Sequence, residues 1–161
     1  MSRGDMELFP TIIMIFAGAG DLTWRKLVPS LFAQHREGRM PKEFAILTVD
    51  RVAFRDKDLH HRFLEGVKRF SRDKKVKAAD WHEFARHITY LQGDFQDPVT
   101  YSNLGKRCAQ LDAKWKVKAG HIFHLATPPA MVRVIPKLLA NAGLNGVSGK
   151  VSGNKDAVAT G

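Results

Sequence analysis

The sequence contains a single cysteine and no long apolar run. Because Cys108 has no second cysteine to pair with, an internal disulfide is excluded, and a reducing compartment is expected. The apolar stretch 11–20 is shorter than the roughly 20 residues that a membrane-spanning helix needs, and it contains glycines at its end. The N-terminal residues include acids and show no signal-peptide cleavage site. These features predict a soluble cytoplasmic protein.

Acidic residues are few relative to basic ones. The 161 residues include 26 Lys and Arg against 16 Asp and Glu, which gives a formal net charge of +10. The basic residues gather at 62–77 and 114–118, and such surfaces attract phosphates of any kind. Nucleic-acid binding would also require a recognisable motif or interleaved aromatic residues, which we do not find. We interpret the charge as a preference for small anionic ligands and keep charge-driven nucleic-acid binding as an alternative.

Apolar segments without helical spacing alternate with segments of helical spacing. Strands are predicted at 10–16, 44–49, 87–92 and 121–125, with helices between them and one helix after the last strand. This order is typical of an α/β fold with a doubly wound parallel sheet, Rossmann-like, of about four strands in the order 3-2-1-4. The length supports one domain with a substantial core.

Several acidic residues are placed where a helix should begin. We predict that Asp56 and Asp97 are N-caps and that Asp80 and Glu83 form a capping box. The helix after Asp56 has an apolar face with the spacing i, i+4, i+8 and i+11, made of Leu59, Phe63, Val67 and Phe70.

The alternation ends at Leu144. Residues 145–161 are rich in glycine and serine and lack aromatic residues, so we predict a domain at 1–144 and a flexible tail at 145–161. A sheet of this kind usually continues for at least one more strand. Its fourth strand would therefore have an unpaired edge, through which the chain could associate with a partner.

Glycines follow the first strand directly, in the pattern Gly18-Ala19-Gly20-x-x-Thr23. Glycines here let the backbone approach a diphosphate, and the following helix presents N–H groups to it. The third glycine of G-x-G-x-x-G is missing, and two glycines alone often serve only to turn the chain. Between strand and helix, the pattern favours dinucleotide binding. The second strand ends in Asp50 and Arg51, which suit a ribose hydroxyl and a 2′-phosphate respectively, so spacing alone leaves the cofactor open.

Five motifs in register resemble the glucose-6-phosphate dehydrogenase family. Residues 15–31 are similar to the opening of that family, with its glycine turn, basic residues and proline, and they are followed by a G-x-L-P-like segment at 38–41. Arg51 falls on the family's NADP-reading arginine. Residues 90–97 resemble Y-x-x-G-D-Y-x-D, and residues 125–129 resemble L-A-x-P-P. The resemblance covers roughly residues 12–144.

The resemblance implies an NADP-dependent oxidation of glucose 6-phosphate to its lactone, which opens the oxidative pentose phosphate pathway. It places Arg51 on the 2′-phosphate, where a guanidinium suits the anion. It implies a possible cis peptide at a proline of the last motif. It assigns the other cofactor contacts to the diphosphate turn and the nicotinamide side: Gly18, Ala19, Gly20, Asp21 and Leu22, and Ala126, Thr127 and Pro128.

The sequence departs from the family pattern in three ways. Ala17 replaces the first glycine, and Asp50 replaces the small residue before the arginine, where its charge opposes a 2′-phosphate. The family's E-K-P-F-G strand and its R-I-D-H-Y-L-G-K segment, which supply the lysine and the general base, are absent from these 161 residues. The resemblance therefore implies a truncated coenzyme domain that binds NADP without catalysis, and a non-enzymatic nucleotide-binding or association module is the alternative.

No metal site is predicted from the sequence, since no Cys/His cluster has metal-ligand spacing. We interpret His60 and His61 as solvated helix residues, His124 as a packing residue and Cys108 as part of the core.

Overall fold

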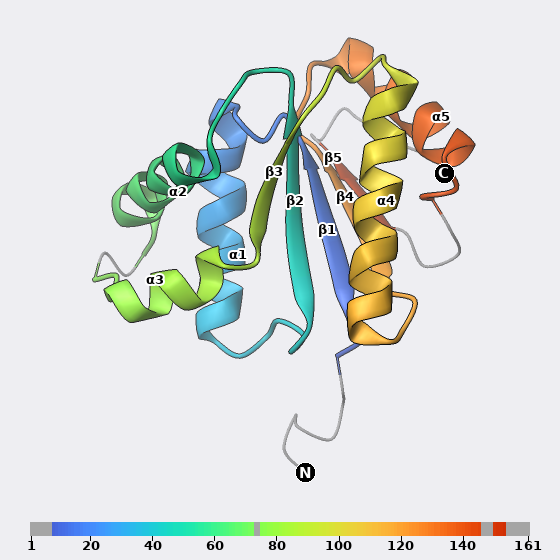
Figure 1. Ribbon diagram of the computed structural model, residues 1–161. Helices are drawn as coiled ribbons and strands as arrows, with labels where there is room; N and C mark the ends of the chain where they lie inside the picture. Colours follow the sequence, from blue (N-terminus) through green and yellow to red (C-terminus); the bar gives the residue numbers. More distant parts are fainter. Residues whose placement is uncertain (1–7, 73–74, 146–149, 154–161) are drawn as a thin grey trace.

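The computed structural model describes residues 8–72, 75–145 and 150–153, the last four by their backbone alone. Five parallel strands form one sheet in the order β3-β2-β1-β4-β5 (Figure 1). The strands are β1 (Thr11–Phe16), β2 (Phe44–Asp50), β3 (Ile88–Gln92), β4 (Gly120–Leu125) and β5 (Lys150–Gly153). The main helices are α1 (Val28–Arg36), α2 (Asp56–Phe70), α3 (Ala78–Ala85), α4 (Pro98–Trp115) and α5 (Val134–Asn141). A π-helix at Thr23–Leu27 precedes α1, and a 3₁₀ turn at Pro129–Val132 precedes α5.

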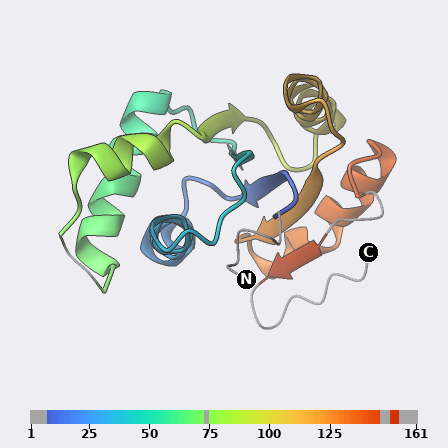
Figure 2. The ribbon, with the colours of Figure 1, turned by 90° about the horizontal axis from the view of Figure 1, so that it is seen from below.

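Helices cover both faces of the sheet (Figures 1 and 2). Side chains of β1 alternate between the two cores: Ile12, Met14 and Phe16 belong to the cluster that includes α4 and α5, whereas Ile13 and Ile15 belong to the one that includes α1, α2 and α3. The central strand therefore has no solvent-facing side, and this is why its sequence is a continuous apolar run. The predicted Rossmann-like fold class is confirmed.

The connections place the sheet's switch point between β1 and β4. The helix after β1 packs on one face, and the helix after β4 packs on the other. In doubly wound sheets, the crevice outside the carboxyl ends of two such strands is the usual ligand site. The topology therefore indicates a ligand site beside the residues that follow Phe16 and Leu125.

The prediction of about four strands was wrong by one strand. Residues 150–153, which were assigned to a flexible tail, form β5 and pair in parallel with residues 122–125 of β4. Glycine and serine weaken a strand. The N–H and C=O groups along the edge of β4, however, can form the hydrogen bonds of a parallel pair with a segment as short as four residues. The edge of β4 is therefore covered along that stretch. The rest of the predicted tail, 146–149 and 154–161, lies outside the described residues, and the boundary at 144 stays a prediction.

One of the three predicted helix starts is correct. The Asp97 carboxylate accepts a hydrogen bond from the Val99 N–H, 3.0 Å away, and caps α4. Asp56 is instead the first residue of α2, and its carboxylate accepts from the Tyr90 N–H across the fold. α3 begins at Ala78, two residues before Asp80, and no side chain caps its start.

The apolar face of α2 is confirmed except at its end. Leu59, Phe63 and Val67 are fully buried, whereas Phe70 is 39% exposed. The Phe70 ring lies at the last residue of the helix and packs edge-on against Trp24, with ring centroids 5.4 Å apart.

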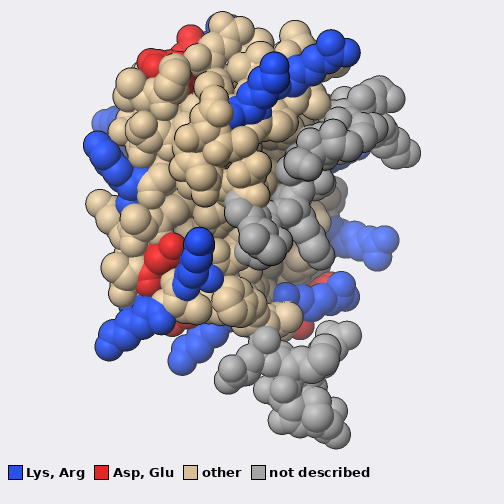
Figure 3. Space-filling view, turned by 90° about the vertical axis from the view of Figure 1, so that its right-hand side faces the viewer, with Lys and Arg blue, Asp and Glu red and all other residues tan. Residues whose placement is uncertain are grey.

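Lys and Arg side chains project separately around a largely uncharged centre on the face shown in Figure 3. That face carries no single basic patch among the described residues. Within the same residues, no helix combines the length and apolar character needed to cross a membrane.

Candidate functional site

The turn after β1 is closed by hydrogen bonds to its neighbours. The N–H groups of Ala17 and Gly18 both donate to the Val49 carbonyl, at 2.9 and 3.0 Å, which ties the turn to the end of β2. The Ala17 carbonyl accepts from the Gly20 N–H and from the Thr23 hydroxyl, each at 2.9 Å. Thr23, which stands three residues after Gly20 where the fingerprint has its third glycine, is fully buried. Its hydroxyl thus gives this position a structural role that glycine could not supply.

Two of the turn residues meet unusual backbone demands. Ala17 has φ 76°, a left-handed conformation that L-residues with a Cβ rarely adopt. At Gly18, a Cβ would lie 2.5 Å from the Cβ of Thr48, so only glycine fits there without a shift of β2. The Ala17 methyl is therefore accommodated at a cost in backbone energy, and Gly18 is required by the closeness of β1 and β2.

The turn runs directly into a helical segment. Asp21 and Leu22 are already helical, and the π-helix at Thr23–Leu27 continues into α1. The first N–H groups of a helix have no partner within it and create partial positive charge at that end. The Asp21 carboxylate accepts from the Trp24 indole N–H at 2.9 Å, so it is held by the helix it begins. The helix can therefore present its amino end to an anion.

The Asp50 side chain bridges the turn and the end of β2. Its Oδ2 accepts from the Ala19 N–H at 3.0 Å, and its Oδ1 accepts from the Arg51 N–H at 2.8 Å. The side chain of Arg51 is exposed, and within the described residues its guanidinium has no hydrogen-bond or ion-pair partner. Among the described residues, Asp50 is therefore the acidic residue whose carboxylate contacts an amide of the turn.

Tyr90 and Gly93 hold the backbone that carries this carboxylate. The Tyr90 hydroxyl donates to the carbonyls of Asp50, at 3.1 Å, and of Val52, while the Gly93 N–H donates to the Asp50 carbonyl at 2.9 Å. Burial, together with the Asp50 charge, raises the pKa of Tyr90 to about 12, so the hydroxyl remains a donor at neutral pH. The resemblance of residues 90–97 to a family motif thus has a physical basis, although the sequence alone did not connect Tyr90 to the site.

Residues 126–128 follow β4 beside the turn. The Ala126 N–H donates to the Phe16 carbonyl at 3.0 Å, which joins the ends of β4 and β1. Thr127 is 7% exposed, and its hydroxyl is buried without a partner in the described part of the chain. Buried hydroxyls are normally hydrogen-bonded, so this group is suited to a ligand.

No described peptide bond is cis, so the possible cis peptide at Pro128 or Pro129 was not found. The chain instead reverses through the 3₁₀ turn that begins there, where the Met131 N–H donates to the Pro128 carbonyl at 3.0 Å.

The predicted site residues converge at the carboxyl ends of three neighbouring strands. The turn follows β1, Arg51 follows β2 and Ala126–Pro128 follow β4, and these three strands are neighbours in the order β2-β1-β4. His124, for which we predicted a packing role, is mostly buried in β4, and this burial lowers its pKa.

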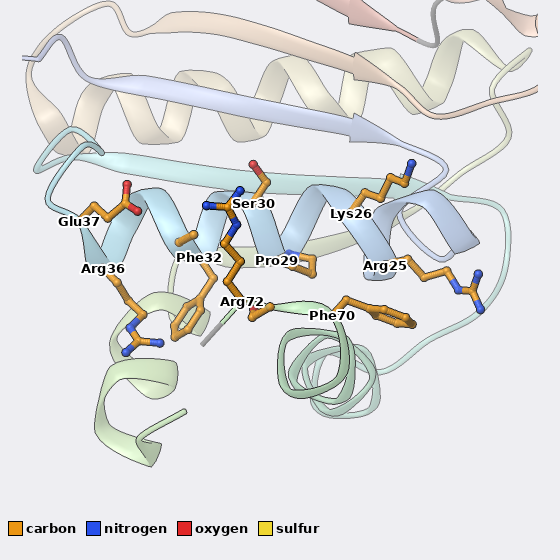
Figure 4. Close-up of a pocket in the computed structure, with 11 residues that line it drawn as sticks. Arg25, Lys26, Pro29, Ser30, Phe32, Arg36, Glu37, Phe70 and Arg72 are labelled. Atoms are coloured by element: carbon orange, nitrogen blue, oxygen red, sulfur yellow. The ribbon is translucent and has the colours of Figure 1, made fainter. Parts of the chain in front are cut away.

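A separate hollow of about 630 Å³ lies along α1 and the end of α2 (Figure 4). Its lining includes Arg25, Lys26, Phe70 and Arg72, and it includes none of the predicted cofactor residues. This hollow therefore does not coincide with the cofactor site that the sequence predicts at the strand ends.

The sequence pattern of the family described as "Glucose-6-phosphate dehydrogenase, NAD binding domain" matches residues 14–153. The chain belongs to this family. It is 29% identical over 133 residues to the glucose-6-phosphate 1-dehydrogenase of Aggregatibacter actinomycetemcomitans, covering 83% of this chain and 26% of that protein. It is 32% identical over 142 residues to the enzyme of Treponema pallidum, covering 88% and 28%.

A solved structure of a glucose-6-phosphate dehydrogenase in complex with its substrate matches this fold with a TM-score of 0.78. The sequences are 29% identical, and the match covers 90% of this chain and 30% of that one. The chain thus spans less than a third of the length of these relatives. The family match also continues to residue 153 and includes β5, whereas the motifs alone ended near Leu144.

The left-handed Ala17 generates a stability prediction. Ala17→Gly should raise the free energy of unfolding by about 1 kcal/mol, because glycine adopts φ 76° without steric cost. Ala19→Gly is the matched control, since Ala19 does not have positive φ, and it should lower the value by about 0.5 kcal/mol. Urea denaturation measures both, and an equal loss in the two variants would contradict the strain at Ala17.

Proposed function

We propose that this chain is a coenzyme domain that binds NADP at the carboxyl edge of β2, β1 and β4. The observation that supports it most is the convergence of the glycine turn, a helix amino end, an unpaired arginine and an unpaired buried hydroxyl at one edge of the sheet. Each of these groups suits a different part of a phosphorylated dinucleotide.

In this proposal Gly18, Ala19, Gly20, Asp21 and Leu22 surround the diphosphate, because their backbone can approach it closely and the helix dipole favours its charge. Arg51 pairs with the 2′-phosphate through its planar guanidinium. Ala126, Thr127 and Pro128 line the nicotinamide side, where the Thr127 hydroxyl can donate or accept. The nicotinamide, when bound, is the hydride acceptor.

We extend the proposal to the reaction of a whole protein that contains such a coenzyme domain. Its relatives are glucose-6-phosphate 1-dehydrogenases, so the proposed reaction is oxidation of glucose 6-phosphate at C1 in the pentose phosphate pathway. The segments that supply the lysine and the general base of this reaction, according to the resemblance, are absent from the 161 residues. The chain by itself therefore binds the coenzyme and does not transfer hydride.

A cytoplasmic location belongs to the same proposal. It is supported by Cys108, a free cysteine buried in α4, because unpaired cysteines are typical of reducing compartments. Burial raises the pKa of its thiol to about 12. Association through the edge of β4, which the sequence predicts to be unpaired, is not part of the proposal, because β5 pairs with residues 122–125 of β4.

Arg51 should decide the affinity for the 2′-phosphate. Arg51→Ala should weaken NADP binding by about 10- to 100-fold, as expected for loss of a charge-assisted contact, and leave NAD binding within about twofold. Isothermal titration calorimetry with both dinucleotides measures the two values.

Arg39→Ala is the matched control, because it removes the same charge from an exposed arginine that is paired with Glu37 beyond the end of α1. It should leave both affinities unchanged. Equal losses for NADP and NAD in Arg51→Ala would contradict recognition of the 2′-phosphate by this side chain.

Asp50 should oppose the same phosphate. Asp50→Asn keeps an oxygen that can accept from the Ala19 N–H but removes the negative charge, so NADP affinity should rise several-fold and NAD affinity should not. The gain should shrink between 50 and about 500 mM salt, because screening weakens the repulsion at exposed sites. A gain for NAD as large as that for NADP would exclude this electrostatic role.

Purified chain should give no glucose-6-phosphate-dependent NADPH formation above background. Loss of both substrate positioning and proton removal costs several orders of magnitude in rate. Absorbance at 340 nm reports the product, and a variant with Arg51→Ala serves as the control for a contaminating enzyme. A rate that persists through purification and falls with Arg51→Ala would overturn the proposal of an inactive coenzyme domain.

A further inference from the structure

Three potential metal ligands meet at the end of the sheet opposite to the carboxyl ends of the strands, where the coenzyme is proposed to bind. His35 lies in the last turn of α1, Glu83 lies in α3, and His87 directly precedes β3. These elements meet at the lower end of the sheet in Figure 1. One nitrogen of each imidazole and one carboxylate oxygen lie within 4.8 Å of one another. No other group of three such side chains was found among the described residues.

His87 is held in the tautomer that a metal site needs. Its Nδ1 lies 2.7 Å from the Phe44 carbonyl oxygen, so Nδ1 carries the proton and donates it. The lone pair is therefore on Nε2, which is left for a ligand. Histidines that bind metals usually have their other ring nitrogen fixed in this way. The ring also stacks on Phe44, with centroids 3.8 Å apart, so its orientation is set by packing.

His35 offers a second imidazole that lacks a partner. Its Nδ1 is buried and has no hydrogen-bond partner in the described part of the chain. The ring lies 6.3 Å from the His87 ring and packs against Phe44 and Phe84. A buried, unpaired ring nitrogen beside a second imidazole is costly without a ligand.

Burial lowers the pKa of both His35 and His87. Neutral imidazole is the form that coordinates a metal, and burial favours this form. Asp80 adds negative charge near His35, and Glu83 adds it near both rings.

We propose that His35, Glu83 and His87 form a binding site for a divalent transition-metal ion of the zinc type, which links α1, α3 and the start of β3. Two imidazoles and one carboxylate are a known ligand set for Zn²⁺, with water as the fourth ligand. Ligand atoms of a tetrahedral zinc ion lie about 3.3 Å apart. The three ligand atoms here lie within 4.8 Å of one another, so binding requires the side chains to move closer together, and Glu83 is exposed.

The positive charge of Arg86 disfavours binding of a cation at this site. Its guanidinium lies 2.7 Å from Glu83 Oε1, and its charge lowers the pKa of both histidines. Metal binding must therefore exchange this exposed ion pair for coordination. Because exposed ion pairs contribute little stability, the exchange is feasible, and removal of Arg86 should favour the metal.

Zinc chloride should be titrated into the untagged, chelator-treated full chain by calorimetry, and cobalt(II) should be titrated with absorption between 500 and 700 nm as the readout. We expect one equivalent to bind, with a tetrahedral cobalt spectrum and a higher melting temperature. Glu83→Gln and His35→Gln should each weaken binding at least about tenfold. Arg86→Gln should strengthen it several-fold.

Glu37→Gln is the matched control for Glu83→Gln, because Glu37 is also an exposed glutamate in an arginine pair. His61→Gln and His82→Gln control for histidines outside the cluster. All three should bind zinc like the unchanged chain. Circular dichroism of the metal-free variants separates loss of folding from loss of a ligand. Glu83→Gln is the variant least able to disturb the fold, because Glu83 is exposed.

Absence of saturable zinc binding to the folded chain would overturn the proposal. So would zinc binding that survives Glu83→Gln and His35→Gln but is lost in His61→Gln or His82→Gln. None of these outcomes depends on the coenzyme, so the proposal can fail while NADP binding stands.

Discussion

The close approach of the turn after β1 to the end of β2 is the constraint on which the proposed coenzyme site depends. Gly18 lies so near Thr48 that no Cβ fits between them. The same approach lets the Val49 carbonyl accept two N–H groups of the turn and lets the Asp50 carboxylate reach the Ala19 N–H. A larger residue at 18 would separate the strands and lose all of these contacts together. The geometry of the turn is therefore a property of two strands, not of the glycine motif alone.

This constraint continues across the sheet to β3. Tyr90 and Gly93 both donate to the Asp50 carbonyl, and Gly93 needs its small size because a Cβ would lie 2.5 Å from Thr100 at the start of α4. Residues more than 70 positions apart in sequence, Ala19 and Gly93, are thus joined through Asp50. Both segments lie within the residues that match the family, and both contribute to one structure around the end of β2.

The sequence predicts those features that local patterns determine. The four longer strands, the start of α4 and the buried face of α2, with Leu59 and Phe63, follow from periodicity and from the cap residue Asp97, and the structure contains them. Three features depend on partners that no local pattern reveals. β5 forms because β4 offers it an edge, the left-handed Ala17 is fixed by its bonds to β2, and the cluster around His35 assembles from segments about 50 residues apart.

Asp50 and Arg51 together set the electrostatics of the proposed 2′-phosphate position. The free chain needs the carboxylate, because it satisfies the Ala19 and Arg51 N–H groups that would otherwise be left without a protein partner. Its charge, however, lies one residue from the guanidinium that would attract the phosphate, so the two charges largely cancel at a distance. Preorganisation of the turn and preference for the phosphorylated dinucleotide are therefore opposed in this sequence. The same carboxylate stabilises the turn and, in the proposed function, lowers the selectivity for NADP.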